Sequence, residues 1–403
     1  MKSYFSVLSA PGAWRFLLPA LAARLPFAML QIGILMLVQW ATGSYGWGGI
    51  ASAAAAVAQA VTGPRMGRLA DRYGQARVLV PQVAAHAVLL GGLLVLARAE
   101  AAPLALIVMA GLAGATMPLV GSMVRARWAH MLPAEKVGTA FAVESITDEL
   151  TFTVAPIILI AVATGFSPVW ALLVALVLVV AGTLAFAAVR TGAPTPTGAT
   201  AKGGGGVLRR RGVGVLAGAL LSIGTVFGSL QVGITSLTEE LGRAGAAGPI
   251  YGTFSAGSMA GGLAYGALRW RTALTRRMAV LLVLLSGALV VPALAHGIGL
   301  MYAAAALAGI VIAPCVITGY TLLDGLVPAG VRTEAYAWLN GAIGLGIATG
   351  AAVAGQLVDA FGPSAAFLFP PLTTAFAAVL VIVRRHNLEP VPVVVPEREL
   401  VAA

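Results

Sequence analysis

The sequence predicts an all-α membrane protein with 12 transmembrane helices, arranged as two six-helix bundles related by a pseudo-two-fold axis. An apolar composition, long charge-free segments and an internal repeat support this prediction. Of the 403 residues, 59% are hydrophobic and 10% are charged, and the mean hydropathy is +0.95. Soluble globular domains do not have this composition. A water-soluble enzyme is therefore excluded, and we expect no enzyme activity.

Nine charge-free segments define the predicted spans. A helix needs about 20 apolar residues to cross a hydrocarbon core about 30 Å thick. Segments 25–64, 150–189 and 278–323 are each long enough for two helices. The other six segments hold one helix each: 78–97, 101–124, 212–238, 244–268, 335–358 and 360–383. The first span is expected to be uncleaved, since no small-residue cleavage site follows a short apolar core.

The basic residues predict the orientation of the chain in a cell membrane. Of 25 Lys and Arg residues, only Arg98 and Arg243 fall in the loops of one side, and Arg24 falls inside a span. The others lie at the termini and in the loops of the opposite side, including Arg125 and Arg127 in the loop after the fourth span. The positive-inside rule then places both termini in the cytoplasm. Because the net charge of +11 is spread over these loops, it does not indicate nucleic acid as a partner.

A shift of 195 residues superposes the two halves of the sequence without a gap. It brings Gly67 onto Gly262 and Pro168 onto Pro363, and it aligns LPAEKVGTAFA at 132 with VPAGVRTEAYA at 327. A constant offset predicts two copies of six spans in the same orientation. We therefore expect bundles at 1–189 and 213–388, a flexible cytoplasmic linker at 190–212, and a cytoplasmic tail at 389–403.

The only cysteine is Cys315, and the four histidines are scattered along the chain. No spacing of Cys and His resembles a metal site. We expect no metal, no cofactor and no catalytic residue.

The loop after the second span has the sequence GRLADRYGQAR at 67–77. It resembles the signature of the major facilitator superfamily at this position, a family of membrane transporters. Gly67, Leu69, Ala70, Asp71, Arg72 and Gly74 match that signature, while Gln75 stands where the family usually has a basic residue. In the second repeat the motif is degenerate, with Gly266 at the position equivalent to Asp71.

The resemblance implies a conformational latch made by Gly67, Asp71, Arg72 and Gly74 against the start of the eleventh span, near Arg332. A glycine on a helix face allows close helix approach, and a carboxylate caps the exposed N–H groups of a helix start. The alternative is a solvated basic turn that only sets topology.

Three carboxylates lie in the fifth span, at Glu144, Asp148 and Glu149. Each charge costs about 2.5 to 3.5 kcal/mol at the centre of a membrane helix, so such residues are rare and functional. Glu144 and Asp148 share a helix face, whereas Glu149 lies about 140° from Glu144 around the axis. Arg24 lies at a similar depth in the first span, which predicts a pair with Glu144. These four residues are the predicted proton-coupling site, unless Arg24 and one acid form a permanent structural pair.

Uncharged polar residues inside the predicted spans are candidates for lining a substrate cavity. The candidate substrate-binding residues are Gln31, Gln39, Gln231, Tyr320 and Asn340. The alternative for each is an ordinary interhelical hydrogen bond.

The resemblance implies a bacterial secondary active transporter of the drug/proton antiporter type, in the inner membrane. We expect alternating access, export of small amphipathic compounds against protons, and a monomer in the lipid bilayer. Two features depart from such antiporters: segment 103–121 contains no arginine, and Ala155-Pro156 replaces a Gly-Pro pair. A proton-coupled sugar or metabolite symporter or a uniporter is the alternative in the same class. A membrane enzyme or a lipid scramblase is the alternative from another class.

The orientation is testable by single-cysteine labelling in a Cys315→Ala background. Cysteines placed at positions 72, 202 and 277 are expected to react with an impermeant thiol reagent only from the cytoplasmic side. Labelling of position 202 from outside intact cells would contradict the predicted topology.

Overall fold

The computed structural model describes residues 2–198, 206–210, 212–268, 270–294 and 297–389. All regular secondary structure in these ranges is helical. The first half contains α1 (Lys2–Leu8), α2 (Ala13–Thr42), α3 (Tyr45–Tyr73), α4 (Gln75–Arg98), α5 (Pro103–Thr116), α6 (Val120–Met131), α7 (Ala134–Gly165) and α8 (Pro168–Ala188). The second half contains α9 (Val213–Glu240), α10 (Ala247–Ala267), α11 (Leu274–Ala293), α12 (Ile298–Leu326), α13 (Arg332–Phe361) and α14 (Phe369–Val383). Short 3-10 turns precede α9, α10, α13 and α14 and follow α14.

In the described ranges, 10 helical segments are long and apolar enough to cross a membrane. One of them, Pro103–Met131, combines α5 and α6, and another, Pro363–Val383, ends with α14. α3 and α10 are not among these ten, but they have 29 and 21 residues and pack against the spanning helices. With these two helices, each half has six spanning segments. The fold is therefore the predicted one, a multi-pass membrane protein built from two six-helix bundles.

The 195-residue offset is visible in the helix boundaries. The segment formed by α5 and α6 runs from Pro103 to Met131, and the same offset gives the bounds of α12, Ile298 and Leu326. The first copy is interrupted at Met117–Leu119 because Pro118 has no N–H group and disfavours a helical conformation at Met117. The second copy continues through Pro314 as one helix.

Close packing within each half depends on glycines at helix crossings. In the second half, Gly224 and Gly228 of α9 lie against the backbone of α13. In the first half, Gly114 of α5 lies against the backbone of Ala55 in α3. Small residues allow such approach, and they replace the hydrophobic driving force that is missing between helices in lipid.

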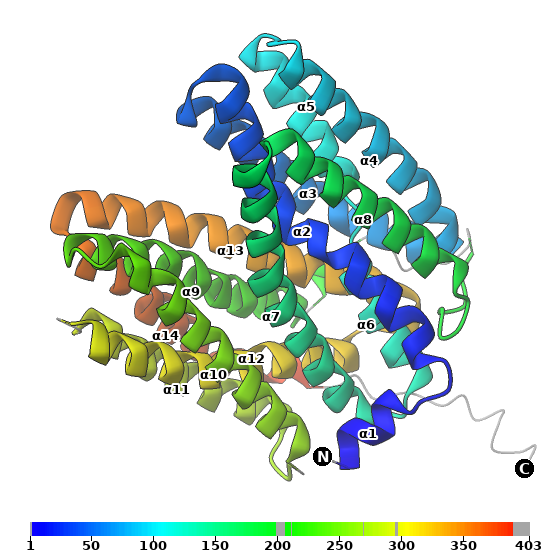
Figure 1. Ribbon diagram of the computed structural model, residues 1–403. Helices are drawn as coiled ribbons and strands as arrows, with labels where there is room; N and C mark the ends of the chain where they lie inside the picture. The colour runs from blue at the N-terminus through cyan, green and yellow to red at the C-terminus, as the bar shows by residue number, and fades with distance from the viewer. Residues whose placement is uncertain (1, 199–205, 211, 269, 295–296, 390–403) are drawn as a thin grey trace, which may run out of the picture.

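The two halves converge at the end of the molecule that carries α1 and diverge toward the opposite end (Figure 1). They meet mainly through α3 with α13 and through α7 with α10 and α12. The structure therefore shows one closed face, on the side of the N-terminus.

The predicted linker and tail are described in part. Residues 199–205, 211 and 390–403, which include Lys202 and most of the predicted tail, lie outside the described residues. At the start of the linker, Thr197 and Gly198 donate backbone hydrogen bonds to the carbonyls of Asp71 and Arg72 at the end of α3, at 3.0 and 3.2 Å. This part of the linker lies on the closed face.

A pair of glycine variants tests the packing of α9 on α13. A Cβ at Gly228 would overlap the backbone of Ile347 and Ala351, so Gly228→Ala is expected to cost about 1 to 3 kcal/mol. The apparent melting temperature in detergent should fall by several degrees. Gly287→Ala on α11 is the control, because nothing lies within 4 Å of its Cβ position. Equal melting temperatures for the two variants would contradict the close contact.

Candidate functional site

A cluster of buried charges lies where α2, α6 and α7 meet. Arg24 of α2 contacts Glu144 of α7, with 2.6 Å between Nη1 and Oε2. This contact confirms the ion pair that was predicted because Arg24 and Glu144 lie at a similar depth in their spans. The side chains of Arg24 and Glu144 are 6% and 0% exposed, and the indole N–H of Trp128 donates a further hydrogen bond to Glu144 at 2.9 Å. Glu144 is therefore enclosed and held from two sides.

Asp148 lies between two arginines. Its carboxylate is 3.4 Å from Nη2 of Arg24 and 2.5 Å from Nη2 of Arg125. The side chain of Asp148 is 34% exposed, whereas that of Arg125 is 2% exposed. Asp148 is thus the member of the cluster that water reaches.

The position of Arg125 corrects the sequence analysis. Arg125 and Arg127 were expected in a loop, after a fourth span that ends near residue 121 without an arginine. Instead, that span resumes after the break at Pro118 and continues as α6 to Met131. Both arginines are buried inside the bundle. The charge-free criterion ended the span early because it treats every arginine as a boundary.

The two arginines of α6 have different surroundings. Arg127 donates to the side chain of Gln75 at 2.8 Å and to the carbonyl of Phe186 at 3.2 Å, and it packs against the rings of Phe16 and Phe186. Its partners belong to the first half and are uncharged. Arg125 instead faces the second half, with its guanidinium 4.2 Å from the ring centre of Tyr320. Arg125 is therefore the arginine of α6 that belongs to the charge cluster.

Glu149 contacts the other half of the protein. Its carboxylate accepts a hydrogen bond of 2.6 Å from the hydroxyl of Ser258 in α10. As the helical geometry predicts, it does not share the face of Glu144. The three acids of α7 thus have three different surroundings.

Two of the predicted substrate-binding residues join the cluster. The Tyr320 hydroxyl donates a hydrogen bond to the Asn340 side chain, and Asn340 donates to Ser122 of α6 at 2.9 Å. Gln31 lies elsewhere, bound to Ser52 at 3.2 Å and to Gln59 at 3.4 Å, both on α3.

Gln39 and Gln231 are not brought into the cluster. Gln39 is half-buried near the end of α2, where its carbonyl receives the N–H of Gly43. The side chain of Gln231 on α9 is exposed.

The predicted latch residues meet the start of α13. The carboxylate of Asp71 accepts hydrogen bonds from the backbone N–H groups of Thr333 and Glu334, at 3.2 and 3.0 Å. A Cβ at Gly67 would lie 2.9 Å from the carbonyl oxygen of Thr333 and from Cα of Glu334. A carboxylate from one half therefore caps a helix start in the other half, at the positive end of the helix dipole.

Arg68 adds an ion pair that sequence reasoning did not single out. Its guanidinium binds both carboxylate oxygens of Glu334, at 2.7 and 3.1 Å. Arg72 lies instead over the ring of Tyr73. Gly74 ends α3 with a φ of 97°, a conformation that favours glycine. The motif could have indicated a role for Arg68, because Arg68 precedes Asp71 by nearly one helical turn.

Further contacts close the same face. Arg332 donates to the carbonyl of Ala129 at 2.9 Å, and Thr139 donates to that of Gly266 at 3.3 Å. The hydroxyl of Tyr4 in α1 is within 3.0 Å of the carbonyls of Gly262 and Leu263 in α10. The sequence gives no indication that α1 reaches the second half.

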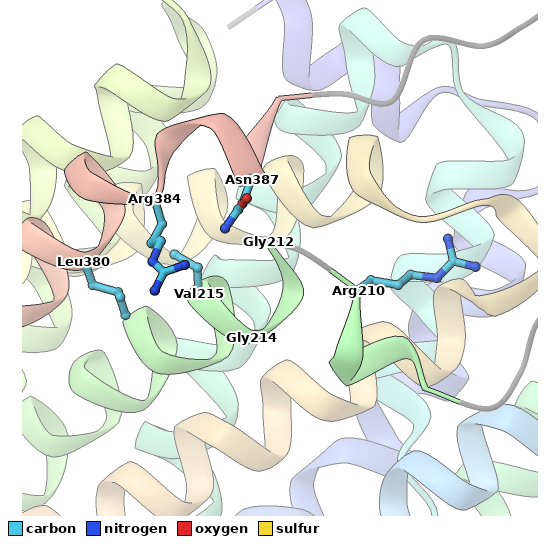
Figure 2. Close-up of a pocket in the computed structure, with 7 residues that line it drawn as sticks. All are labelled: Arg210, Gly212, Gly214, Val215, Leu380, Arg384 and Asn387. Carbon is cyan, nitrogen blue, oxygen red and sulfur yellow. The ribbon is translucent and has the colours of Figure 1, made fainter.

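A surface pocket of about 310 Å³ lies away from the cluster, where the end of the linker meets α9 and α14. Arg384 and Asn387 line one part of it, and the side chain of Arg210 points away from them (Figure 2). Its residues belong to the second half and to the linker, so it is separate from the site at α7.

Two like bundles that meet at one closed face, with a buried charge cluster in the first half, are typical of a secondary transporter. The family model of the Major Facilitator Superfamily matches residues 4–273 and 216–402. The chain therefore belongs to the major facilitator superfamily. None of the curated proteins matches it in sequence.

Solved structures of transporters share the fold. A bacterial homologue of the iron transporter ferroportin in an outward-facing state has a TM-score of 0.73 and 15% identity, over 93% of this chain and 98% of that one. The human organic anion transporter MFSD10 has a TM-score of 0.69 and 14% identity, over 94% and 100%. The E. coli fucose:proton symporter FucP has a TM-score of 0.69 and 14% identity, over 92% and 99%.

The contact of Asp71 is testable by accessibility. Asparagine offers one acceptor oxygen without charge, so Asp71→Asn is expected to weaken the closed face by about 1 to 2 kcal/mol. A cysteine at Ala142, which lies against Gly266 of the other half, should then react faster with a thiol reagent in a Cys315→Ala background.

Glu135→Gln is the matched control, because Glu135 is an exposed carboxylate at the start of α7. Unchanged labelling in Asp71→Asn would argue against a latch. A loss of substrate binding by orders of magnitude, with the fold intact, would assign Asp71 to the substrate site instead.

Proposed function

We propose that the protein is a proton-coupled secondary transporter that moves small amphipathic compounds by alternating access. The observation that carries this proposal is Asp148, a water-accessible carboxylate held between Arg24 and Arg125 at the meeting of the two halves. A buried network of charges is costly in a membrane, so its presence in the first half, against Tyr320 of the second half, supports a functional role. The proposal builds on the transport function of the major facilitator fold.

In this proposal, the closed face is cytoplasmic and the described state opens outward. The distribution of Lys and Arg supports this orientation, with both termini and the linker in the cytoplasm of a cell-membrane protein. Gly67, Asp71 and Gly74, together with Arg68, hold the face closed, while Arg72 contributes to the basic turn. The bundles at 1–189 and 213–388 move against each other, and the protein works as a monomer.

The proton site is Asp148, with Glu144 and Arg24 as its supporting pair. Glu144 is fully enclosed and has two partners, so it is the less available proton acceptor. Asp148 becomes available when either arginine moves away, because a cation at contact distance favours the ionised carboxylate. Glu149 bridges to Ser258 of the other half and is the second candidate, since its contact must break when the halves separate.

Arg24 and Arg125 also affect whether the proton and the compound move in opposite directions or together. Export against protons, which the family resemblance implies, results when the compound and the proton compete for one carboxylate. A cationic compound at Asp148 would have to lie beside two guanidinium groups. This repulsion favours the alternative mode, in which proton and compound bind together and move as a symport.

The proposal is tested by flux measurements in vesicles with Asp148→Asn, Glu144→Gln and Glu149→Gln, using a compound first identified by thermal stabilisation. Neutralising the proton carrier should abolish accumulation driven by a pH gradient but preserve downhill exchange, because the cavity survives. Asp148→Asn is expected to show this pattern.

Glu239→Gln serves as a control, because Glu239 is exposed at the end of α9. If all three variants of α7 keep full pH-driven accumulation, the proton site lies elsewhere or the protein is a uniporter.

A further inference from the structure

We infer that the transported compound carries an anionic group, of the carboxylate type, which binds Arg125 in place of Asp148 while Asp148 holds a proton. The inference rests on the proposed function and names the class of substrate for the same site. It predicts that each anion enters the site together with one proton.

Arg125 has the properties of an anion-binding residue. Its side chain is 2% exposed, and arginine does not lose its proton in proteins, so an anionic partner strongly stabilises this buried charge. In the described part of the chain, its Nε–H has no hydrogen-bond partner. The ring of Tyr320 covers the guanidinium face, which leaves the nitrogen edge for ligands. The planar edge of a guanidinium suits a carboxylate.

Asp148 is the partner that is easiest to replace. Its side chain is 34% exposed, while those of Glu144 and Arg24 are 0% and 6% exposed. Glu144 also accepts the hydrogen bond of Trp128, which keeps it in place. An incoming carboxylate therefore competes with Asp148 and not with Glu144.

The charge balance requires a proton. With both acids ionised, Glu144 and Asp148 balance Arg24 and Arg125. Protonation of Asp148 leaves two buried cations against one anion, and an unbalanced buried charge is strongly unfavourable. A substrate carboxylate restores the balance, whereas an ammonium group would add a third positive charge.

The other polar groups near Asp148 do not alter this balance. Glu149 follows it directly in the chain, but its carboxylate is directed to Ser258 on α10. The Tyr320 hydroxyl is bound to Asn340, which in turn donates to Ser122. These groups are already satisfied within the protein.

An apolar platform lies beside the cluster. Phe27 and Phe152 follow Arg24 and Asp148 by about one helical turn on α2 and α7, toward the open end. Their rings pack edge to face at 6.1 Å, and Phe152 is 46% exposed. Because residues four apart share a helix face, Phe152 lies on the same face as Asp148. The site thus fits a compound with a carboxylate at one end and an aromatic or aliphatic body at the other.

The test measures binding of matched probes to the purified full-length protein by calorimetry. The probes are phenylacetate and hexanoate, each compared with its amide and with the amine of similar length. The carboxylates are expected to bind at least about tenfold more tightly than the amides. In weakly buffered solution, each carboxylate bound should bring about one proton with it. Preference for the amines or amides, or binding of none of the six probes, overturns the inference.

Variants of Asp148 and Arg125 test which residue takes up the proton and which binds the carboxylate. Asp148→Asn is expected to bind the carboxylates with an affinity that no longer depends on pH and without proton uptake. The double variant Arg125→Gln with Asp148→Asn removes both charges, so no buried charge is left unpaired, and should bind them about tenfold or more weakly. Arg98→Gln is the control, because Arg98 is exposed at the opposite end of the bundle. Equal carboxylate binding by Asp148→Asn and the double variant overturns the role of Arg125.

The outcomes separate this inference from the proposed function. If Asp148→Asn abolishes pH-driven flux but the compound is neutral or cationic, the transporter assignment stands and the anionic class fails. If the carboxylates bind to Arg125 without proton uptake in the wild type, the anionic class stands, while the coupled proton and the coupling role of Asp148 fail.

Discussion

The structure depends on the pairing of two arginines with two acids inside a membrane protein. A single charge at the centre of a spanning helix costs about 2.5 to 3.5 kcal/mol, and removing one member of a buried pair leaves the other without compensation. Arg24, Glu144, Asp148 and Arg125 therefore fix how α2, α6 and α7 lie against one another. The break at Pro118 is consistent with this arrangement, since α6 begins after it and carries Arg125.

The internal repeat shows that this pairing is confined to one half. The 195-residue offset relates Arg24, Glu144 and Asp148 to Ala219, Leu339 and Ile343. It also relates Arg125 to Tyr320, and these two equivalent residues stack on each other between the halves. Because these three equivalents are uncharged, the second half has no counterpart of the cluster, and the charge chemistry of this site belongs to the first half.

The fold was predictable from sequence because it follows from local properties: charge-free segments of sufficient length and a constant repeat offset. The pair of Arg24 with Glu144 was also predictable, from depth alone. Arg125 was not, because a break at a proline followed by an arginine looks like the end of a span. Arg68 and Tyr4 were missed for another reason, since their partners lie 266 and about 258 residues away and only the packing of the two halves brings them together.

The closed face and the charge cluster are linked through shared helices. The first turn of α13 contains Thr333 and Glu334, which bind Asp71, and about two turns later its Asn340 binds Ser122 of α6, three residues from Arg125. α7 contacts Gly266 through Thr139 and then presents Glu144, Asp148 and Glu149 in the next turns. The repeat offset relates Thr139 to Glu334 and Asp71 to Gly266, so these two contacts of the closed face join equivalent positions. Because helices in a packed bundle move as rigid elements, separation of this face must also displace α6 and α7 relative to α10, α12 and α13. Such a displacement moves Arg125 from Tyr320 and Glu149 from Ser258, which is how opening of the face would change the surroundings of the α7 carboxylates.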